Sequence, residues 1–334
     1  MNYKTKLLPK VSIIILSFNG ENYLVDCLSS IRKQNYPKNK IEIVVVDNGS
    51  KDKSVEIARK FKCKVLIKPK TDIYENWVFG MKIITGDFVY MVDQDIELRD
   101  KNFIKKMVRP LFEDESISGS YTRAYPNKKM SWINRYLSYQ PSMCDPLYEF
   151  LTPSIQSSVV KKNKNYELCV FNDTNINAES RMLYRLSVFK KTPNWKAKRL
   201  FDHDILVSTV KLGFNKFAYV PAAGFYHYHA KDFRSLLRKR VRNLKIHFFP
   251  YQSLLQYKWV DSKQKKQVLR LFLWVIYANL FFPAFLKGVY KTLKYKDVVL
   301  LMEPMVVIII TDFVLFSFLT DKRGRKIVFS WLKL

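Results

Sequence analysis

Two carboxylates separated by one residue, Asp93 and Asp95, follow directly after the apolar run at 88–92. On an extended segment, residues two apart point to the same side, so both side chains can face one ligand. Carboxylate oxygens hold hard divalent cations, and such a cation can neutralise a diphosphate leaving group. The pattern D-x-D is common by chance, but its place at the end of an apolar run predicts a site for Mn²⁺ or Mg²⁺.

A second acidic pair, Asp202 and Asp204, precedes a helical pattern over 205–212, and Gly213 closes that pattern as a helix C-cap would. A carboxylate here can act as the general base that removes a proton from an acceptor hydroxyl. An acidic residue at a helix start can equally be a simple cap. The sequence leaves both interpretations open.

Two histidines, His227 and His229, lie beyond a predicted strand at 216–220. A histidine near a carboxylate pair can be a metal ligand. A lone histidine is more often structural, so both roles stay open, and His227 is the better candidate ligand of the two.

The elements that must position these side chains alternate between strands and helices over 11–125. The strands are predicted from runs of mostly apolar residues at 11–16, 41–46, 64–67 and 88–92. Nearly continuous apolar runs are typical of strands buried on both faces, and helical spacing fills the segments between them. The order predicts an α/β fold, a mostly parallel central sheet with helices on both faces.

Polar side chains stand where these strands end. Ser17 and Asn19 follow the first strand, Asp47 ends the second, and Asp93 and Asp95 end the fourth. Ligands of parallel α/β sheets bind at the carboxyl ends of the strands, so a ligand is expected here. Asp47 can accept hydrogen bonds from a nucleobase or ribose, although Asp-Asn-Gly is also an ordinary turn sequence.

The composition restricts the partners without choosing among them. The chain has 334 residues and a net charge of +29, which favours nucleic acid, an anionic membrane or phosphorylated substrates as partners. The four cysteines are widely spaced with no C-x-x-C pair, which predicts buried thiols in a reducing compartment.

The C-terminal third changes character. Residues 231–248 predict a basic amphipathic helix, which suits a lipid interface or, alternatively, packs on the protein. Two apolar stretches follow, at about 268–290 and 299–319, each long enough to cross a bilayer. A hairpin in one leaflet and buried core helices are the alternatives. Pro283 interrupts the first stretch, and Glu303 and Asp312 interrupt the second.

Five segments, taken in order, resemble glycosyltransferase family 2, inverting enzymes of the GT-A fold, over roughly residues 10–230. They are SIIILSFNGENYLVDCLSSI (12–31), IEIVVVDNGSKDKSVEIA (41–58), GDFVYMVDQDIEL (86–98), MLYRLSVF (182–189) and FDHDILVSTVKLGFNKFAYVPAAGFYH (201–227). One departure is Phe201, which stands where the family usually has Glu.

The resemblance implies a role for each candidate residue. Asp202 takes the place of the catalytic base, and Asp204 matches the second acid of that block. Asp95 would be the main metal ligand, Asp93 would contact ribose or metal, and His227 would contact metal or diphosphate. The nucleotide contacts implied are Ser17, Asn19, Glu21, Asp47 and Asp93.

The expected arrangement is a GT-A catalytic domain at 1–230, with a nucleotide-sugar half at 10–125 and an acceptor half at 126–230. A basic interfacial region at 231–262 and a membrane region at 263–334 would follow. The expected reaction is metal-dependent transfer from a UDP- or GDP-linked sugar to a membrane-embedded acceptor, such as a polyprenyl or dolichyl lipid or a lipid-linked glycan. Because such donors are made in the cytosol, the catalytic domain should face the cytoplasm.

Two other functions are less compatible with the sequence. A nucleotidyltransferase on a similar fold would need a glycine-rich phosphate loop, and 17–21 does not supply one. A non-catalytic basic protein, bound to membrane or nucleic acid, would not need acidic residues at strand ends. No nucleic-acid partner is therefore expected.

Overall fold

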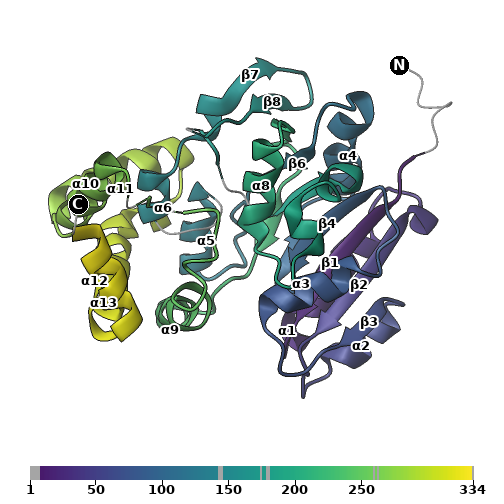
Figure 1. Cartoon of the computed structure of the whole chain (residues 1–334), viewed down its shortest axis with the longest axis horizontal. Coiled ribbons are helices and arrows are strands. Elements are labelled where there is room, and N and C mark those ends of the chain that lie inside the picture. The colour runs from purple at the N-terminus through teal and green to yellow at the C-terminus, as the bar shows by residue number, and fades with distance from the viewer. Residues whose placement is uncertain are drawn as a thin grey trace. The chain divides into compact units, whose positions relative to one another are not determined.

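The computed structural model describes residues 8–141, 146–173, 175–177, 181–258, 260–261 and 263–332. Figure 1 shows the chain coloured by residue number. The chain divides into two compact units. Unit 1 comprises Met1–Ala124 and Ser154–His227, and unit 2 comprises Tyr125–Pro153 and Tyr228–Leu334. Tyr125–Pro153 thus clusters with the C-terminal helices, and the domain bounds expected from the sequence stay a prediction.

The described part of unit 1 is built on a nine-stranded sheet in the order β3-β2-β1-β4-β9-β6-β10-β8-β7. Strands β1 to β4 run parallel, as predicted, whereas β9 is antiparallel to both of its neighbours. The sheet is therefore parallel in its first half and mixed in its second. The strands are β1 Val11–Ser17, β2 Ile41–Asp47, β3 Lys64–Ile67, β4 Phe88–Asp93, β6 Gly119–Tyr121, β7 Val159–Lys162, β8 Glu167–Val170, β9 Met182–Arg185 and β10 Lys216–Tyr219.

Helices cover both faces of this sheet. Successive residues of a strand point to opposite faces. On β4, Val89 and Met91 belong to one apolar cluster with Trp77 of α3, while Tyr90 between them contacts Phe103 of α4. This burial on both sides explains the nearly continuous apolar strands. The helices are α1 Glu21–Arg32, α2 Ser54–Lys60, α3 Ile73–Met81, α4 Phe103–Glu113, α7 Leu186–Phe189 and α8 Asp202–Lys211.

A small second sheet in unit 1 pairs β5 (Ile96–Leu98) with β11 (Phe225–His227) in antiparallel register. Cys27 and Cys169 are buried and Cys63 is half-buried, all three with free thiols, and Cys144 lies outside the described residues.

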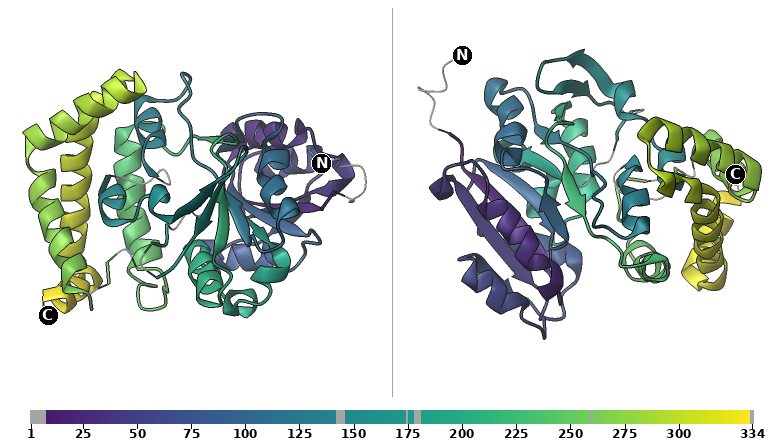
Figure 2. Two further views of the ribbon diagram at one scale, coloured as in Figure 1. Left: turned by 90° about the horizontal axis from the view of Figure 1, so that it is seen from above. Right: turned by 180° about the vertical axis from the view of Figure 1, so that it is seen from behind.

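Unit 2 is helical in its described residues. Its core gathers Trp274, Ala278 and Val307. Helices α11 and α12 contact each other along their sides (Figure 2). The helices are α5 Trp132–Ser138, α6 Pro146–Leu151, α9 Phe233–Asn243, α10 Lys265–Ala278, α11 Phe281–Tyr295, α12 Glu303–Thr320 and α13 Lys322–Leu332, with a π-helical turn at Leu244–Phe248.

The first apolar stretch, expected as one helix, is divided. Helices α10 and α11 meet at 88°. Leu280 between them adopts an extended conformation, and Pro283 falls in the first turn of α11, where proline removes no hydrogen bond. In the second stretch, Val298–Thr320 is long and apolar enough to cross a membrane by length and composition, and 44% of its most apolar window is buried in the protein.

The predicted basic helix is α9 with its π-helical extension. Its basic residues Arg234, Arg238, Arg242 and Lys245 are exposed, while its apolar stripe is half-buried. Phe248 contacts Phe318 of α12, with 6.0 Å between ring centroids. The apolar stripe therefore packs at least partly on the protein, which was one of the two alternatives.

Candidate active site

The candidate residues at the ends of β1, β2 and β4 lie along one edge of the sheet in unit 1. Ser17 pairs in register with Asp47, and Leu16 pairs with both Val46 and Asp93. Because the three strands are parallel and in register, their carboxyl ends coincide. The predicted alignment of these polar residues along one edge is therefore observed, and ligand binding at that edge stays a prediction.

The middle residue of the D-x-D segment, Gln94, was not singled out from the sequence, yet it links two of the strand-end loops. Its amide oxygen accepts from the Phe18 N–H at 2.9 Å, and its amide nitrogen donates to the Phe18 carbonyl at 3.1 Å. A Cβ atom on Gly20 would lie 2.0 Å from the Gln94 amide oxygen. Glycine at position 20 therefore leaves the space in which Gln94 crosses between the loops.

Two predicted nucleotide contacts hold a neighbouring loop. The side-chain oxygen of Asn19 accepts from the Lys51 N–H at 3.0 Å. A carboxylate oxygen of Glu21 accepts from the Lys53 N–H at 3.1 Å. These bonds connect the loop after β1 to the loop after β2, so both residues hold the two loops together beside the strand ends.

Asp47 is fully buried, and its carboxylate accepts hydrogen bonds from the turn that follows it. One carboxylate oxygen accepts from the N–H groups of Gly49 and Ser50 at 2.9 and 2.7 Å, and the other accepts from the Ser50 hydroxyl at 2.5 Å. The turn interpretation of Asp-Asn-Gly is thus confirmed, and a nucleotide contact by Asp47 stays a prediction. The Ser17 hydroxyl oxygen is buried and has no hydrogen-bond partner among the described residues, and a nucleotide contact by Ser17 stays a prediction.

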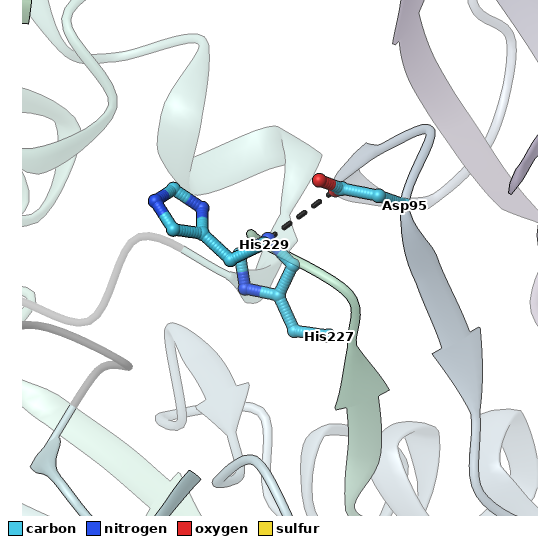
Figure 3. A group of neighbouring side chains, drawn as sticks. All are labelled: Asp95, His227 and His229. Atoms are coloured by element: carbon cyan, nitrogen blue, oxygen red, sulfur yellow. Dashed lines mark ion pairs between the residues drawn. The ribbon is translucent and has the colours of Figure 1, made fainter. Parts of the chain in front are cut away.

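Asp95 and His227 come together because β5 pairs with β11. In this register His227 lies opposite Ile96, the residue after Asp95. The Asp95 carboxylate and His227 Nε2 are 3.2 Å apart (Figure 3), and the His227 side chain is almost fully buried. His229, also labelled in Figure 3, stands two positions later, in the second segment of unit 2.

The spacing of these two atoms fits a divalent cation. Two ligands at right angles on an ion with bonds of about 2.1 Å lie about 3 Å apart. A carboxylate and an imidazole nitrogen are both ordinary ligands for such ions. Asp95 and His227 therefore form a candidate metal site.

Asp93 contacts a residue that sequence reasoning missed. A carboxylate oxygen of Asp93 accepts from Arg181 Nη2 at 3.0 Å. The guanidinium also lies over the Phe225 ring, 5.9 Å from its centroid. No motif or periodic pattern in the sequence around Arg181 indicates a role for it, and its partner Asp93 is 88 positions away.

Asp202 is the first residue of α8, and its side chain is one-third exposed. The helix N-cap is Phe201, which makes no side-chain capping bond, so Asp202 is not the N-cap residue. Burial opposes ionisation of Asp202, but the neighbouring His203, through its electrostatic effect and its hydrogen bonds, and the positive charge of Arg181 more than offset it. The pKa of Asp202 is therefore lower than usual, and its carboxylate is ionised at neutral pH.

The other residues of the acidic block are less accessible. Asp204 is 2% exposed, on the inner face of α8. Phe201, which replaces the usual Glu, packs its ring on Tyr74 with 4.4 Å between centroids. Among Phe201, Asp202 and Asp204, only Asp202 thus has an acidic side chain that is partly exposed.

The chain matches the family described as glycosyl transferase family 2 over residues 12–192, more than half its length. The chain is a member of that family. The resemblance recognised from the five motifs is confirmed, and with it the prediction of a transferase. The match favours glycosyl transfer over the nucleotidyltransferase and non-catalytic alternatives.

Similar proteins from bacteria and archaea are also named glycosyltransferases. An uncharacterised glycosyltransferase, the MG060 homolog of Mycoplasma pneumoniae, is 24% identical over 307 residues, covering 81% of this chain and 96% of that protein. Glycosyltransferase AglE of Haloferax volcanii is 49% identical over 57 residues, 17% of this chain and 19% of that protein. Poly(ribitol-phosphate) beta-N-acetylglucosaminyltransferase TarS of Staphylococcus aureus is 34% identical over 92 residues, 26% and 16% respectively. The chain thus spans less than a fifth of AglE and of TarS.

Among solved structures, the mannosyltransferase PcManGT of Pyrobaculum calidifontis, in complex with GDP-Man and Mn²⁺, has a TM-score of 0.51 to this chain. The likeness covers 92% of this chain and 88% of that one at 13% identity, so it concerns the fold alone. The predicted GT-A fold is confirmed.

Proposed function

We propose that this chain is an inverting glycosyltransferase that moves a sugar from a UDP- or GDP-linked donor to a membrane-embedded acceptor. The acceptor would offer a hydroxyl or phosphate of a polyprenyl or dolichyl lipid or of a lipid-linked glycan. The observation that carries the proposal is the pairing of Asp95 with His227 beside the carboxyl ends of β1, β2 and β4. A nucleotide diphosphate bound at that edge would meet this pair.

In the proposed reaction, the ionised Asp202 accepts the proton of the acceptor hydroxyl while the hydroxyl oxygen attacks the anomeric carbon. The bond between that carbon and the donor diphosphate breaks, so one displacement inverts the centre. The low pKa of Asp202 supports this role because the base is already ionised at neutral pH. A phosphate acceptor would need no base, since its oxygen is already ionised.

The leaving diphosphate requires positive charge. Asp95 and His227 would hold a divalent cation, which, when bound, would neutralise that charge. A nitrogen ligand favours Mn²⁺ over Mg²⁺, because Mg²⁺ is bound mainly by oxygen. Arg181 forms an ion pair with Asp93 and lowers the pKa of Asp202. Its positive charge would therefore add to that of the cation at the proposed site.

A membrane location is supported by the surface of unit 2. Large apolar side chains are exposed on α10, α11 and α12, and exposed basic side chains lie on α9 and α13. Exposed apolar surface together with exposed basic groups in one unit suits an anionic bilayer rather than nucleic acid. The catalytic unit would face the cytoplasm, where nucleotide sugars are made.

The test is turnover of UDP- and GDP-linked sugars by detergent-purified protein with lipid extract, in Mn²⁺, Mg²⁺ or EDTA. We expect one nucleoside diphosphate to be released, with Mn²⁺ preferred and EDTA inhibiting. The variant Asp95→Ala should lose this activity, while Asp26→Ala, which removes an exposed carboxylate on α1, should retain it. Absence of turnover with every donor and lipid extract would contradict the proposal.

A further inference from the structure

Helices α10 and α11 of unit 2 each present an apolar stripe to solvent. On α10 the stripe is Leu269, Phe272, Leu273 and Ile276, and on α11 it is Phe282, Phe285, Leu286, Tyr290 and Leu293. Spacings of three and four put each set on one face of its helix. Phe282 and Leu293 are each 74% exposed. Exposed apolar stripes on two successive helices mark a binding surface.

These two helices are too short to cross a bilayer separately. With 1.5 Å of rise per residue, the 14 residues of α10 and the 15 of α11 reach about 21 and 22 Å, against about 30 Å of hydrocarbon. The 88° bend prevents them from crossing together as one straight rod. Amphipathic helices of this length can instead lie in the plane of the interface.

The first turn of α12 is inside the protein. Glu303 has no exposed surface, accepts from the Tyr136 hydroxyl at 2.8 Å and lies 3.4 Å from the Lys291 ammonium. Lys291 in turn contacts Glu149 at 2.9 Å. These charges stabilise one another within unit 2, which anchors the start of α12 to α5, α6 and α11 rather than to lipid.

The middle of α12 carries an exposed acid. Asp312 is exposed and accepts from the Asn279 side chain at 3.3 Å, beside the bend between α10 and α11. A charged group facing the centre of a bilayer costs about 2.5–3.5 kcal/mol on insertion scales. An α12 that crossed the bilayer would place Asp312 near that centre, whereas a shallow position leaves it among polar headgroups.

Exposed basic side chains on other helices of unit 2 complement an anionic surface. They are Arg234, Arg238, Arg242 and Lys245 on α9 with its extension, and Lys322, Arg323, Arg325 and Lys326 on α13. Each basic group near an anionic leaflet contributes about 1 kcal/mol. Apolar insertion and basic attraction together favour a lipid surface over another apolar partner.

We propose that unit 2 binds one leaflet of an anionic membrane, with the apolar stripes of α10 and α11 inserted at the acyl boundary and α12 not crossing the bilayer. This inference rests on the membrane location in the proposed function and states how the chain is held there. It would keep both ends of α12 on the side where the donor is made.

Binding is tested by sedimenting the full chain with vesicles of phosphatidylcholine alone and with added phosphatidylglycerol. We expect binding that requires the anionic lipid and weakens with salt. The double variant Phe282→Ser/Leu286→Ser should bind at least about tenfold more weakly, because two apolar side chains no longer insert. The matched control is Val160→Ser, which replaces an exposed apolar residue of unit 1 and should bind as the wild type does.

The single-leaflet mode is tested by labelling Lys294→Cys and Lys322→Cys, which flank α12, with an impermeant maleimide in right-side-out and inverted membrane vesicles. Labelling of both sites in the same orientation supports the inference. Labelling in opposite orientations would show a crossing helix and overturn it, while leaving membrane association intact.

Absence of binding to any vesicle would overturn both the inference and the membrane part of the proposed function, but donor turnover would still stand. Oligomers that dissociate in the Phe282→Ser/Leu286→Ser variant, without vesicle binding by the wild type, would show that the face joins copies of the chain. That outcome also overturns the inference.

Discussion

Substituting alanine for Gly20 tests whether Gln94 couples the loops at the strand ends. The backbone φ of Gly20 is −108°, which alanine adopts without strain, so the effect is steric alone. The new methyl group would lie 2.0 Å from the Gln94 amide oxygen. Gln94 must therefore move away and release both bonds to Phe18.

The magnitude follows from those two bonds. Each contributes about 0.5–1.5 kcal/mol, and because both are near solvent we expect about 1–2 kcal/mol together. Hydrogen exchange of the Phe18 amide, followed by mass spectrometry, should accelerate by roughly 5–30-fold in Gly20→Ala. The Michaelis constant for the donor should rise, because the loop after β1 loses its link to the D-x-D segment.

The double variant decides the cause. In a Gln94→Ala background the methyl group meets no amide, so Gly20→Ala should add little further effect. If Gly20→Ala is equally damaging in both backgrounds, or if Phe18 exchange is unchanged in Gly20→Ala, the coupling by Gln94 is wrong.

Three further predictions concern the base, its neighbour and the buried charges. Asp202→Asn should lower kcat by about 10²–10⁴ with a hydroxyl acceptor and leave donor binding unchanged, measured by product formation and calorimetry; full activity would exclude the base. Arg181→Met removes a charge that lowers the pKa of Asp202, so the loss of activity on acidification should begin at a higher pH than in the wild type; an unmoved pH profile would refute this role. Glu303→Ala leaves Lys291 buried with one acid fewer and should cost about 3 kcal/mol of unfolding free energy in denaturant titration. Asp312→Ala, at an exposed site, should change the free energy of unfolding by no more than about 0.5 kcal/mol. Equal losses in the two variants would contradict the stabilising role of the buried Glu303.

The alignment of polar residues at the strand ends could be predicted because its determinants are local. Apolar runs define β1, β2 and β4, and the parallel-sheet rule brings Ser17, Asp47 and Asp93 to one edge. The second half of the sheet could not be ordered from pattern, since β6, β9 and β10 are strands of three or four residues paired over long sequence separations.

The site residues that were missed act through distant partners. Gln94 meets a loop 76 positions away, and Arg181 meets Asp93 88 positions away. Neither residue belongs to a periodic pattern or motif that would have indicated its role. Asp95 and His227 were both candidates, but only the pairing of β5 with β11, far apart in the sequence, shows that they meet.

The apolar stretches were recognised by length but not by shape. Composition cannot show that Leu280 becomes extended and turns the chain between α10 and α11. Nor can it show that Glu303 finds Tyr136 and Lys291, because those contacts depend on Tyr125–Pro153 clustering with the C-terminal helices.

The most direct test of the site is Mn²⁺ binding, followed by electron paramagnetic resonance on the full chain with and without UDP or GDP. The structure predicts that one of these nucleotides tightens Mn²⁺ binding in the wild type, and that Asp95→Ala and His227→Ala each abolish the effect while Asp26→Ala retains it. Mn²⁺ binding that is equally tight in Asp95→Ala and His227→Ala would contradict the assignment of this pair as the metal site.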